Sequence, residues 1–120
     1  MGVGMVKVDL EKVGQILIVG IDGELDLKTA PVFKQKVEEK MGQHENIRHI
    51  MVDFAGVPFM DSSGLGVLLF RFKQIQQLGG KMVLVNVKPH LMKMFSGFFR
   101  IMEIYPDRAE GLKALGGIQD

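Results

Sequence analysis

The sequence predicts an α/β fold, a mixed and mostly parallel β-sheet with helices packed against it. Short runs of branched apolar residues alternate along the chain with segments whose apolar residues recur every three or four positions. Helices between strands act as crossover connections, and crossovers give parallel pairing. A length of 120 residues, with 47% hydrophobic and 24% charged residues, suits one folded domain. The predicted order is β-β-α-β-α-β-α-β-α, in a single domain over residues 1–120.

Two strands open this order. Val6, Val8 and Leu10 alternate with polar residues, which is typical of a half-buried strand. Gln15–Ile21 is apolar on both faces and predicts a central strand. Because only a short break around Gly14 separates the two, we expect them to pair as an antiparallel hairpin.

The first helix is predicted from Ala30 to Met41, where apolar residues recur at helical spacing. Thr29 is a candidate N-cap, Pro31 suits the first turn, and Gly42 can end the helix. The charged residues of this segment fall on the opposite face, which indicates that one side packs on the sheet.

The middle of the chain predicts a strand, a helix and a second strand. Ile47–Phe54 is rich in branched residues and leads into a helix over about Ser63–Leu78. Gly79 and Gly80 end this helix, and Lys81–Val87 reads as a further buried strand.

The last elements are shorter. Pro89 opens a third helix that runs through Phe95, and Ile101–Tyr105 is the last strand. Asp107 and Glu110 have the spacing of a capping box, which predicts a final helix.

Composition excludes several classes of function. The chain has 15 Lys and Arg against 14 Asp and Glu, and its net charge of +1 gives no long-range attraction for nucleic acid or an anionic membrane. Without cysteine it has no disulfide, thiolate zinc site or cysteine nucleophile. The longest apolar runs, Ile16–Ile21 and Leu65–Phe70, are far shorter than the roughly 20 residues that span a bilayer. We expect a soluble cytoplasmic protein without a signal peptide.

No enzyme signature is complete in the sequence. His44, His49 and His90 lack the spacing of metal ligands, and core or surface roles suit them better. Residue order does not exclude a Ser-His-Asp triad, although the serine turn is not G-x-S-x-G. Gly64–Leu69 nearly matches G-x-G-x-x-G but ends in leucine, and there is no P-loop. We therefore expect no enzymatic activity, no cofactor and no metal.

The acidic residues Asp22, Glu24 and Asp26 lie in one predicted loop and could bind a cation. We favour a solvated loop whose acids cap backbone N–H groups. Most of the 9 methionines are expected to fill the core, while a few, Met60 among them, could form an adaptable contact surface.

The segment Asp61-Ser62-Ser63-Gly64 lies beyond the carboxyl end of a predicted parallel strand, where open α/β sheets place functional sites. Aspartate and serine are good N-caps, and because one cap suffices, at least one hydroxyl stays free. A phosphate on that hydroxyl would add about −1.5 to −2 charges beside Asp61 and repel a partner shaped for the neutral serine. Gly64 and Gly66 are expected to expose backbone and let another surface approach.

The helix behind the serines has apolar residues on and off its core stripe. Leu65, Leu68 and Ile75 belong to that stripe. Val67 and Phe70 fall outside it, so that either a second element buries them or they form a contact patch near the serines.

The segment "FMDSSGLGVLL" resembles the signature of the STAS domain in bacterial anti-sigma factor antagonists. The resemblance is closest to the sporulation branch of that family, which counteracts the anti-sigma-F factor. One departure is a link within Met94–Tyr105 that is a residue or two shorter than the family pattern. The resemblance covers nearly the whole chain, because further segments match in the same order: "GELD" (23–26), "KQKV" (34–37), "IRHI" (47–50) and "FKQIQQLGGKMV" (72–83).

The resemblance implies a STAS-like fold in which Ser62 is the phosphoacceptor. It also implies that the kinase is the partner itself, an anti-sigma factor with bound ATP or ADP, and that a PP2C-type phosphatase reverses the modification. The unphosphorylated antagonist would bind the anti-sigma factor and free the sigma factor. We expect no nucleic-acid or membrane partner, and a monomer when free. The resemblance further implies that Ser63 is a second serine that is not phosphorylated. The implied contact residues are Asp26, Met60, Asp61, Ser63, Gly64, Leu65 and Gly66.

Two other functions stay open on the sequence alone. An aspartyl-phosphate receiver is suggested by Asp53 at a strand end and by Lys88 and Pro89 after a later strand, but the acid pair that would hold magnesium after the first strand is missing. A nucleotide-binding enzyme is suggested by the incomplete glycine pattern, but no lysine-bearing phosphate loop accompanies it.

Overall fold

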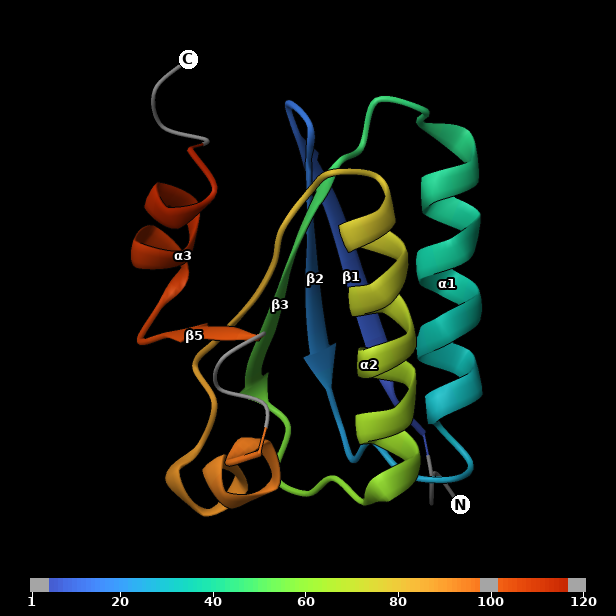
Figure 1. Ribbon diagram of the computed structural model, residues 1–120. Coiled ribbons are helices and arrows are strands. Elements are labelled where there is room, and N and C mark those ends of the chain that lie inside the picture. Colours follow the sequence, from blue (N-terminus) through green and yellow to red (C-terminus); the bar gives the residue numbers. More distant parts are fainter. Residues whose placement is uncertain (1–4, 98–101, 117–120) are drawn as a thin grey trace.

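The computed structural model describes residues 5–97 and 102–116, which form a five-stranded sheet with helices on both faces (Figure 1). None of the helices in these two segments is long and apolar enough to cross a membrane. In chain order the elements are β1 (Lys7–Val13), β2 (Ile16–Asp22), α1 (Ala30–Gln43), β3 (His49–Gly56), α2 (Ser62–Gln77), β4 (Met82–Val85), the 3₁₀ helix η1 (Pro89–Phe95), β5 (Glu103–Tyr105) and α3 (Arg108–Ala114).

The strands lie in the sheet in the same order as in the chain, from β1 to β5. β1 and β2 form an antiparallel hairpin in which Leu10 is opposite Val19, and Gly14 turns the chain with a φ of 60°. The other neighbours are parallel, with Val19 beside Val52 and Val52 beside Leu84. The predicted mixed, mostly parallel sheet is therefore confirmed.

Each face of the sheet has its own core. α1 and α2 lie side by side over one face, where their buried side chains meet alternate residues of β2 and β3 (Figure 1). α3 lies over β3, β4 and β5 on the other face, and Leu115 joins Met51 and Val83 there. β2 contributes Leu17 to the first core and Ile18 to the second, which confirms it as a central strand buried on both faces.

Some details of the predicted elements are wrong. Thr29 stands at the N-cap of α1, but its hydroxyl donates to the Glu24 carbonyl at 2.7 Å and so holds the preceding loop instead. The third helix has its predicted bounds, Pro89–Phe95, and is a 3₁₀ helix. β4 ends at Val85, before the predicted Val87, because Asn86 has a φ of 57°. Ile101, which was predicted to begin the last strand, lies outside the described residues, as does part of the Met94–Tyr105 link.

The predicted end of α2 at two glycines is confirmed, and close packing is the reason. Gly79 has a φ of 81°, which favours glycine. A Cβ on Gly80 would lie 1.6 Å from the carbonyl oxygen of Arg48. The chain can therefore turn from α2 into β4 beside Arg48 only with glycine at position 80.

Candidate functional site

The candidate site is built from the loops that follow β2 and β3. The N–H of Leu25 donates to the Phe59 carbonyl at 3.0 Å, and the Leu25 carbonyl accepts from the N–H of Asp61 at 3.2 Å. Leu25 and Met60 also form an isolated parallel bridge. These bonds hold the two loops together, and they bring Asp26 close to the start of α2. As predicted, the site lies beyond the carboxyl end of a parallel strand.

Asp61 is the N-cap of α2. Its Oδ1 accepts from the N–H groups of Ser63 at 2.8 Å and Gly64 at 3.4 Å, and its carbonyl accepts from the N–H of Leu65 at 3.2 Å. α2 therefore begins at Ser62, one residue earlier than predicted. Of the three candidate caps in this segment, the helix uses the carboxylate of Asp61, which leaves Ser63 the contact role that the resemblance implies. Ser62 is exposed and Ser63 is half-buried.

Met60 and Gly64 form the floor beneath the start of α2. Met60 is only 3% exposed, so the prediction that it lies on a contact surface is wrong. A Cβ on Gly64 would lie 2.7 Å from the Leu25 carbonyl oxygen, so close packing demands glycine there, and the prediction of an exposed backbone is wrong too. Gly66, by contrast, is exposed, and a Cβ there would meet nothing within 4 Å. Leu65 is half-buried against the core.

Asp26 stabilises the loop that packs beside Asp61. Its Oδ1 accepts from the N–H groups of Lys28 at 2.9 Å and Thr29 at 3.1 Å, and from the Thr29 hydroxyl at 3.2 Å. The hydrogen bond from the Thr29 N–H, followed by the others, lowers the pKa of Asp26 below its ordinary value, so the carboxylate is ionised at neutral pH. The geometry at Asp26 is that of a capping acid, as the favoured interpretation of this loop predicted.

The two apolar residues off the core stripe differ in burial. Val67 is half-buried and packs on the core, whereas Phe70 is 48% exposed and available to a contact surface. The Nζ of Lys34 lies 4.8 Å from the centroid of the Phe70 ring, and the guanidinium carbon of Arg71 lies 5.3 Å from it. Arg71 is buried, and its pKa is lowered by burial against the opposing effect of Glu38, with which it pairs at 3.3 Å. Sequence reasoning missed Arg71, because an arginine in a helix pattern indicates solvent.

A second polar cluster lies near the carboxyl end of β3, on the face that α3 covers. Asp53 Oδ2 accepts from Arg108 Nε at 2.6 Å, and Oδ1 accepts from Asn86 Nδ2 at 3.0 Å and from the N–H of Ala55 at 2.9 Å. Burial would raise the pKa of Asp53, but these three hydrogen bonds outweigh it and lower the pKa. A carboxylate held in this way is a structural group, which argues against the receiver alternative.

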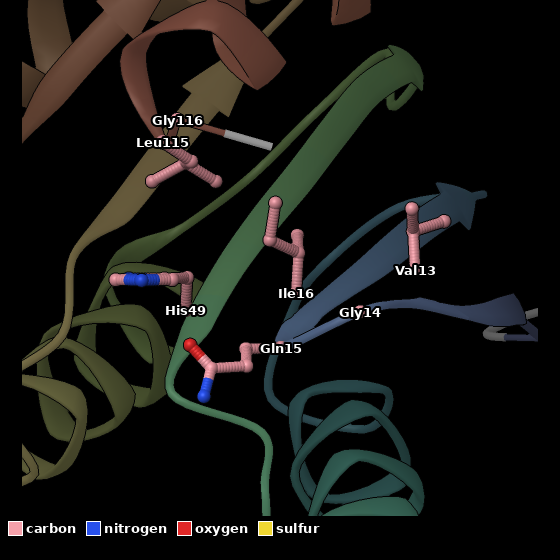
Figure 2. A pocket seen from close by; sticks show the side chains of 7 residues that line it. All are labelled: Val13, Gly14, Gln15, Ile16, His49, Leu115 and Gly116. Carbon is pink, nitrogen blue, oxygen red and sulfur yellow. The ribbon is translucent and has the colours of Figure 1, made fainter. Parts of the chain in front are cut away.

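A hollow of about 310 Å³ opens at the opposite end of the sheet, where β2 and β3 begin (Figure 2). It lies between the β1–β2 turn, His49 and Leu115. The Nδ1 of His49 accepts from the N–H of Lys81 at 3.0 Å. Burial, and then the positive charges of Arg48 and Lys81, lower the pKa of His49. His49 is the one titratable group among the residues that line this hollow, so the hollow offers no pair of acid and base.

Comparison with known proteins gives one consistent family. The model of the STAS domain matches residues 7–111. The anti-sigma F factor antagonist of Paenibacillus polymyxa is 38% identical over 111 residues, which cover 91% of this chain and 94% of the relative. The anti-sigma-B factor antagonist of Bacillus subtilis (strain 168) is 32% identical over 116 residues, which cover 95% and 98%.

Solved structures of the anti-sigma factor antagonist SpoIIAA have the same fold. Its unphosphorylated form matches with a TM-score of 0.72 at 25% identity, over 94% of this chain and 98% of that one. Its phosphorylated form matches with a TM-score of 0.70 at 27% identity, over 90% and 98%. The family model covers the sheet, α1 and α2, with Asp61 and Ser62 at the start of α2. The chain therefore belongs to the STAS domain family and, within it, to the anti-sigma factor antagonists.

Proposed function

We propose that phosphorylation controls this antagonist at Ser62. The unphosphorylated form binds an anti-sigma factor and releases the sigma factor, and the kinase activity of the anti-sigma factor ends that binding by phosphorylating Ser62. The observation that carries the proposal is the exposed position of Ser62 as the first residue of α2, where Asp61 already caps the helix. Because folding does not depend on the Ser62 hydroxyl, a phosphate there leaves the domain intact.

Charge explains how the phosphate would act. It adds about −1.5 to −2 charges next to Asp61 and close to the ionised Asp26. The positive end of the α2 dipole offsets part of this charge, but Asp61 already occupies the N–H groups of Ser63 and Gly64. The phosphate therefore faces the partner. A kinase that still holds ADP at this surface presents phosphates of like charge, which weakens the complex.

The partners in this scheme are an anti-sigma factor serine kinase with bound ATP or ADP and a PP2C-type phosphatase. The chain acts as a monomer in the cytoplasm and performs no catalysis itself, and it needs neither nucleic acid nor a membrane. Met60 and Gly64 support the contact from beneath, because both are buried. The partner would touch the more accessible residues of the site: Asp26, Asp61, Ser62, Ser63, Leu65 and Gly66.

We assign the antagonist to the sporulation factor sigma-F. Identity to the sigma F relative of Paenibacillus polymyxa, at 38%, exceeds the 32% identity to the sigma-B relative of Bacillus subtilis, and this difference supports the assignment, although a second sigma F relative, of Lysinibacillus sphaericus, is 28% identical. Binding to purified anti-sigma-F and anti-sigma-B kinases in the presence of ADP tests it. The complex with the anti-sigma-F kinase is expected to be the tighter one, and the reverse order would move the protein to sigma-B control.

The phosphorylation site is tested by incubation with the anti-sigma kinase and ATP, followed by mass spectrometry with site mapping. Wild-type protein and Ser63→Ala, the matched control, are expected to gain phosphate on Ser62. Ser62→Ala is expected to gain none and to bind the anti-sigma factor constantly. Ser62→Asp should weaken binding by roughly tenfold or more, because it adds charge at the contact. Phosphate on Ser63 or Asp53, with Ser62 unmodified, would contradict the proposal.

A further inference from the structure

The surroundings of Gly66 do not explain why this residue is glycine. A glycine inside a helix lowers stability by about 1 kcal/mol relative to alanine. Two residues earlier, Gly64 has to be glycine because it packs closely against Leu25. A Cβ on Gly66, by contrast, would point into open space. Gly66 is also not one of the described residues that have a positive φ. The packing of the described residues therefore gives no reason for glycine at this position.

Gly66 lies in a stripe with two other exposed residues of α2. Ser62, Gly66 and Phe70 follow one another at intervals of four residues, so they share one face of the helix. Because Gly66 has no side chain and a Cβ there would meet nothing within 4 Å, the helix backbone is open to a partner between Ser62 and Phe70. Phe70 is 48% exposed, so its ring is accessible to a partner on this face of the helix.

The charged groups around Phe70 are mainly basic. Lys34 lies over the ring, and Lys73 is exposed one turn along α2. Glu38 pairs with both Lys34 and the buried Arg71 at 3.3 Å, so one carboxylate serves two cations. The surface beside Phe70 therefore keeps a net positive charge and suits an acidic partner segment.

We propose that a segment of the anti-sigma factor crosses α2 at Gly66, in contact with the helix backbone. An apolar side chain of that segment packs on Phe70, and an acidic side chain beside it faces Lys34. This inference rests on the proposed function and extends the contact surface two turns beyond Ser62, onto α1. The occupant is the anti-sigma factor because the stripe is continuous with Ser62. A two-fold contact between two copies of this chain would bring the same positively charged surface of both copies together, and like charges repel.

Substitution of Gly66 gives a test in which stability and binding change in opposite directions. Gly66→Ala is expected to raise the melting temperature by about 3–6 °C, because alanine is the better helix residue. The same variant should bind the ADP-loaded anti-sigma factor kinase about tenfold more weakly, and Gly66→Gln more weakly still. Gly42→Ala is the matched control, since Gly42 is an exposed glycine in α1 with open space around it. It should also raise the melting temperature while binding is unchanged.

Phe70 is tested against a residue of equal exposure on the same helix segment. Phe70→Ala should weaken binding by about tenfold, as expected for an aromatic anchor. Leu78→Ala should not, although Leu78 is also 48% exposed, because it lies at the far end of α2. Both variants should keep the wild-type circular dichroism spectrum. Surface plasmon resonance with the immobilised kinase measures the affinities.

The outcomes separate this inference from the proposed function. If wild-type protein binds the kinase and gains phosphate on Ser62, but Gly66→Gln and Phe70→Ala bind as tightly, only the inference is wrong. It is also wrong if these two variants change self-association in sedimentation while kinase binding stays the same. If wild-type protein fails to bind the kinase at all, both the proposed function and the inference are wrong.

Discussion

Two groups of polar residues lie near the carboxyl end of β3, and they differ in what their polar atoms contact. On the α3 face, both carboxylate oxygens of Asp53 have partners, and the residue is only 8% exposed. On the α2 side, the Asp61 carboxylate caps the helix while the neighbouring Ser62 is exposed. Both groups stand where open α/β sheets place functional sites. Position at the carboxyl edge alone therefore does not identify the functional residue.

The difference lies in which polar group the fold requires. Removal of Asp53 leaves Asn86 and the N–H of Ala55 without their acceptor, so the sheet and α3 depend on it. Removal of the Ser62 hydroxyl leaves the cap of α2 in place, because Asp61 supplies it. A modifiable residue has to be exposed and dispensable for folding, and only the second group contains one.

Substitution of Asp53 is expected to have the largest effect on stability. Asp53→Ala should lower the free energy of unfolding by about 2–3 kcal/mol, because it removes three hydrogen bonds from a nearly buried site. Arg108→Ala should cost less, about 1 kcal/mol, because that side chain is 43% exposed. Urea denaturation measures both values.

The kinase reaction on the same variants tests the contrast between the two groups. Folded Asp53→Ala is expected to gain phosphate on Ser62 at the wild-type rate. A loss of phosphate incorporation in Asp53→Ala, with Ser62 still present and the domain folded, would reverse the roles that we assign to the two groups.

Asp61 and Asp107 provide a smaller and matched test, because each caps a helix. Asp61 caps α2, and Asp107 caps α3 by accepting from the N–H of Glu110 at 2.9 Å. Either substitution to alanine should cost about 1 kcal/mol of stability, measured by thermal denaturation. Only Asp61→Ala should also slow the phosphorylation of Ser62, because it alone lies at the proposed contact. Equal rates in the two variants would show that Asp61 acts as a cap and nothing more.

Local patterns were sufficient for the elements and for the place of the site. The continuous apolar run in Gln15–Ile21 is a property of adjacent residues, and it predicted a central strand correctly. What the sequence did not reveal depends on distant segments. Gly64 and Gly66 look equivalent in the sequence, and only the packing of Leu25 against the first distinguishes them. The Asp53–Arg108 pair spans 55 residues, so no local pattern indicates it.

The smallest expected effect is a change of folding stability with pH. It tests whether stability near neutral pH depends on a group far from Ser62. The pKa of His49 lies below its ordinary value of 6.5, so the unfolded chain takes up a proton at this residue more readily than the folded chain. Stability should therefore fall as the pH drops through and below about 6.5. The contribution of Asp53, whose pKa is also lowered, is lost only below its ordinary value of 3.8. In His49→Asn the decline between pH 7 and 5 should flatten, because asparagine cannot titrate and its Oδ1, at the place of Nδ1, can still accept from the N–H of Lys81. Melting temperatures of wild type and the variant, measured across this pH range, test the prediction. If the melting temperature falls with pH at the same slope in both proteins, His49 does not contribute to the pH dependence of stability.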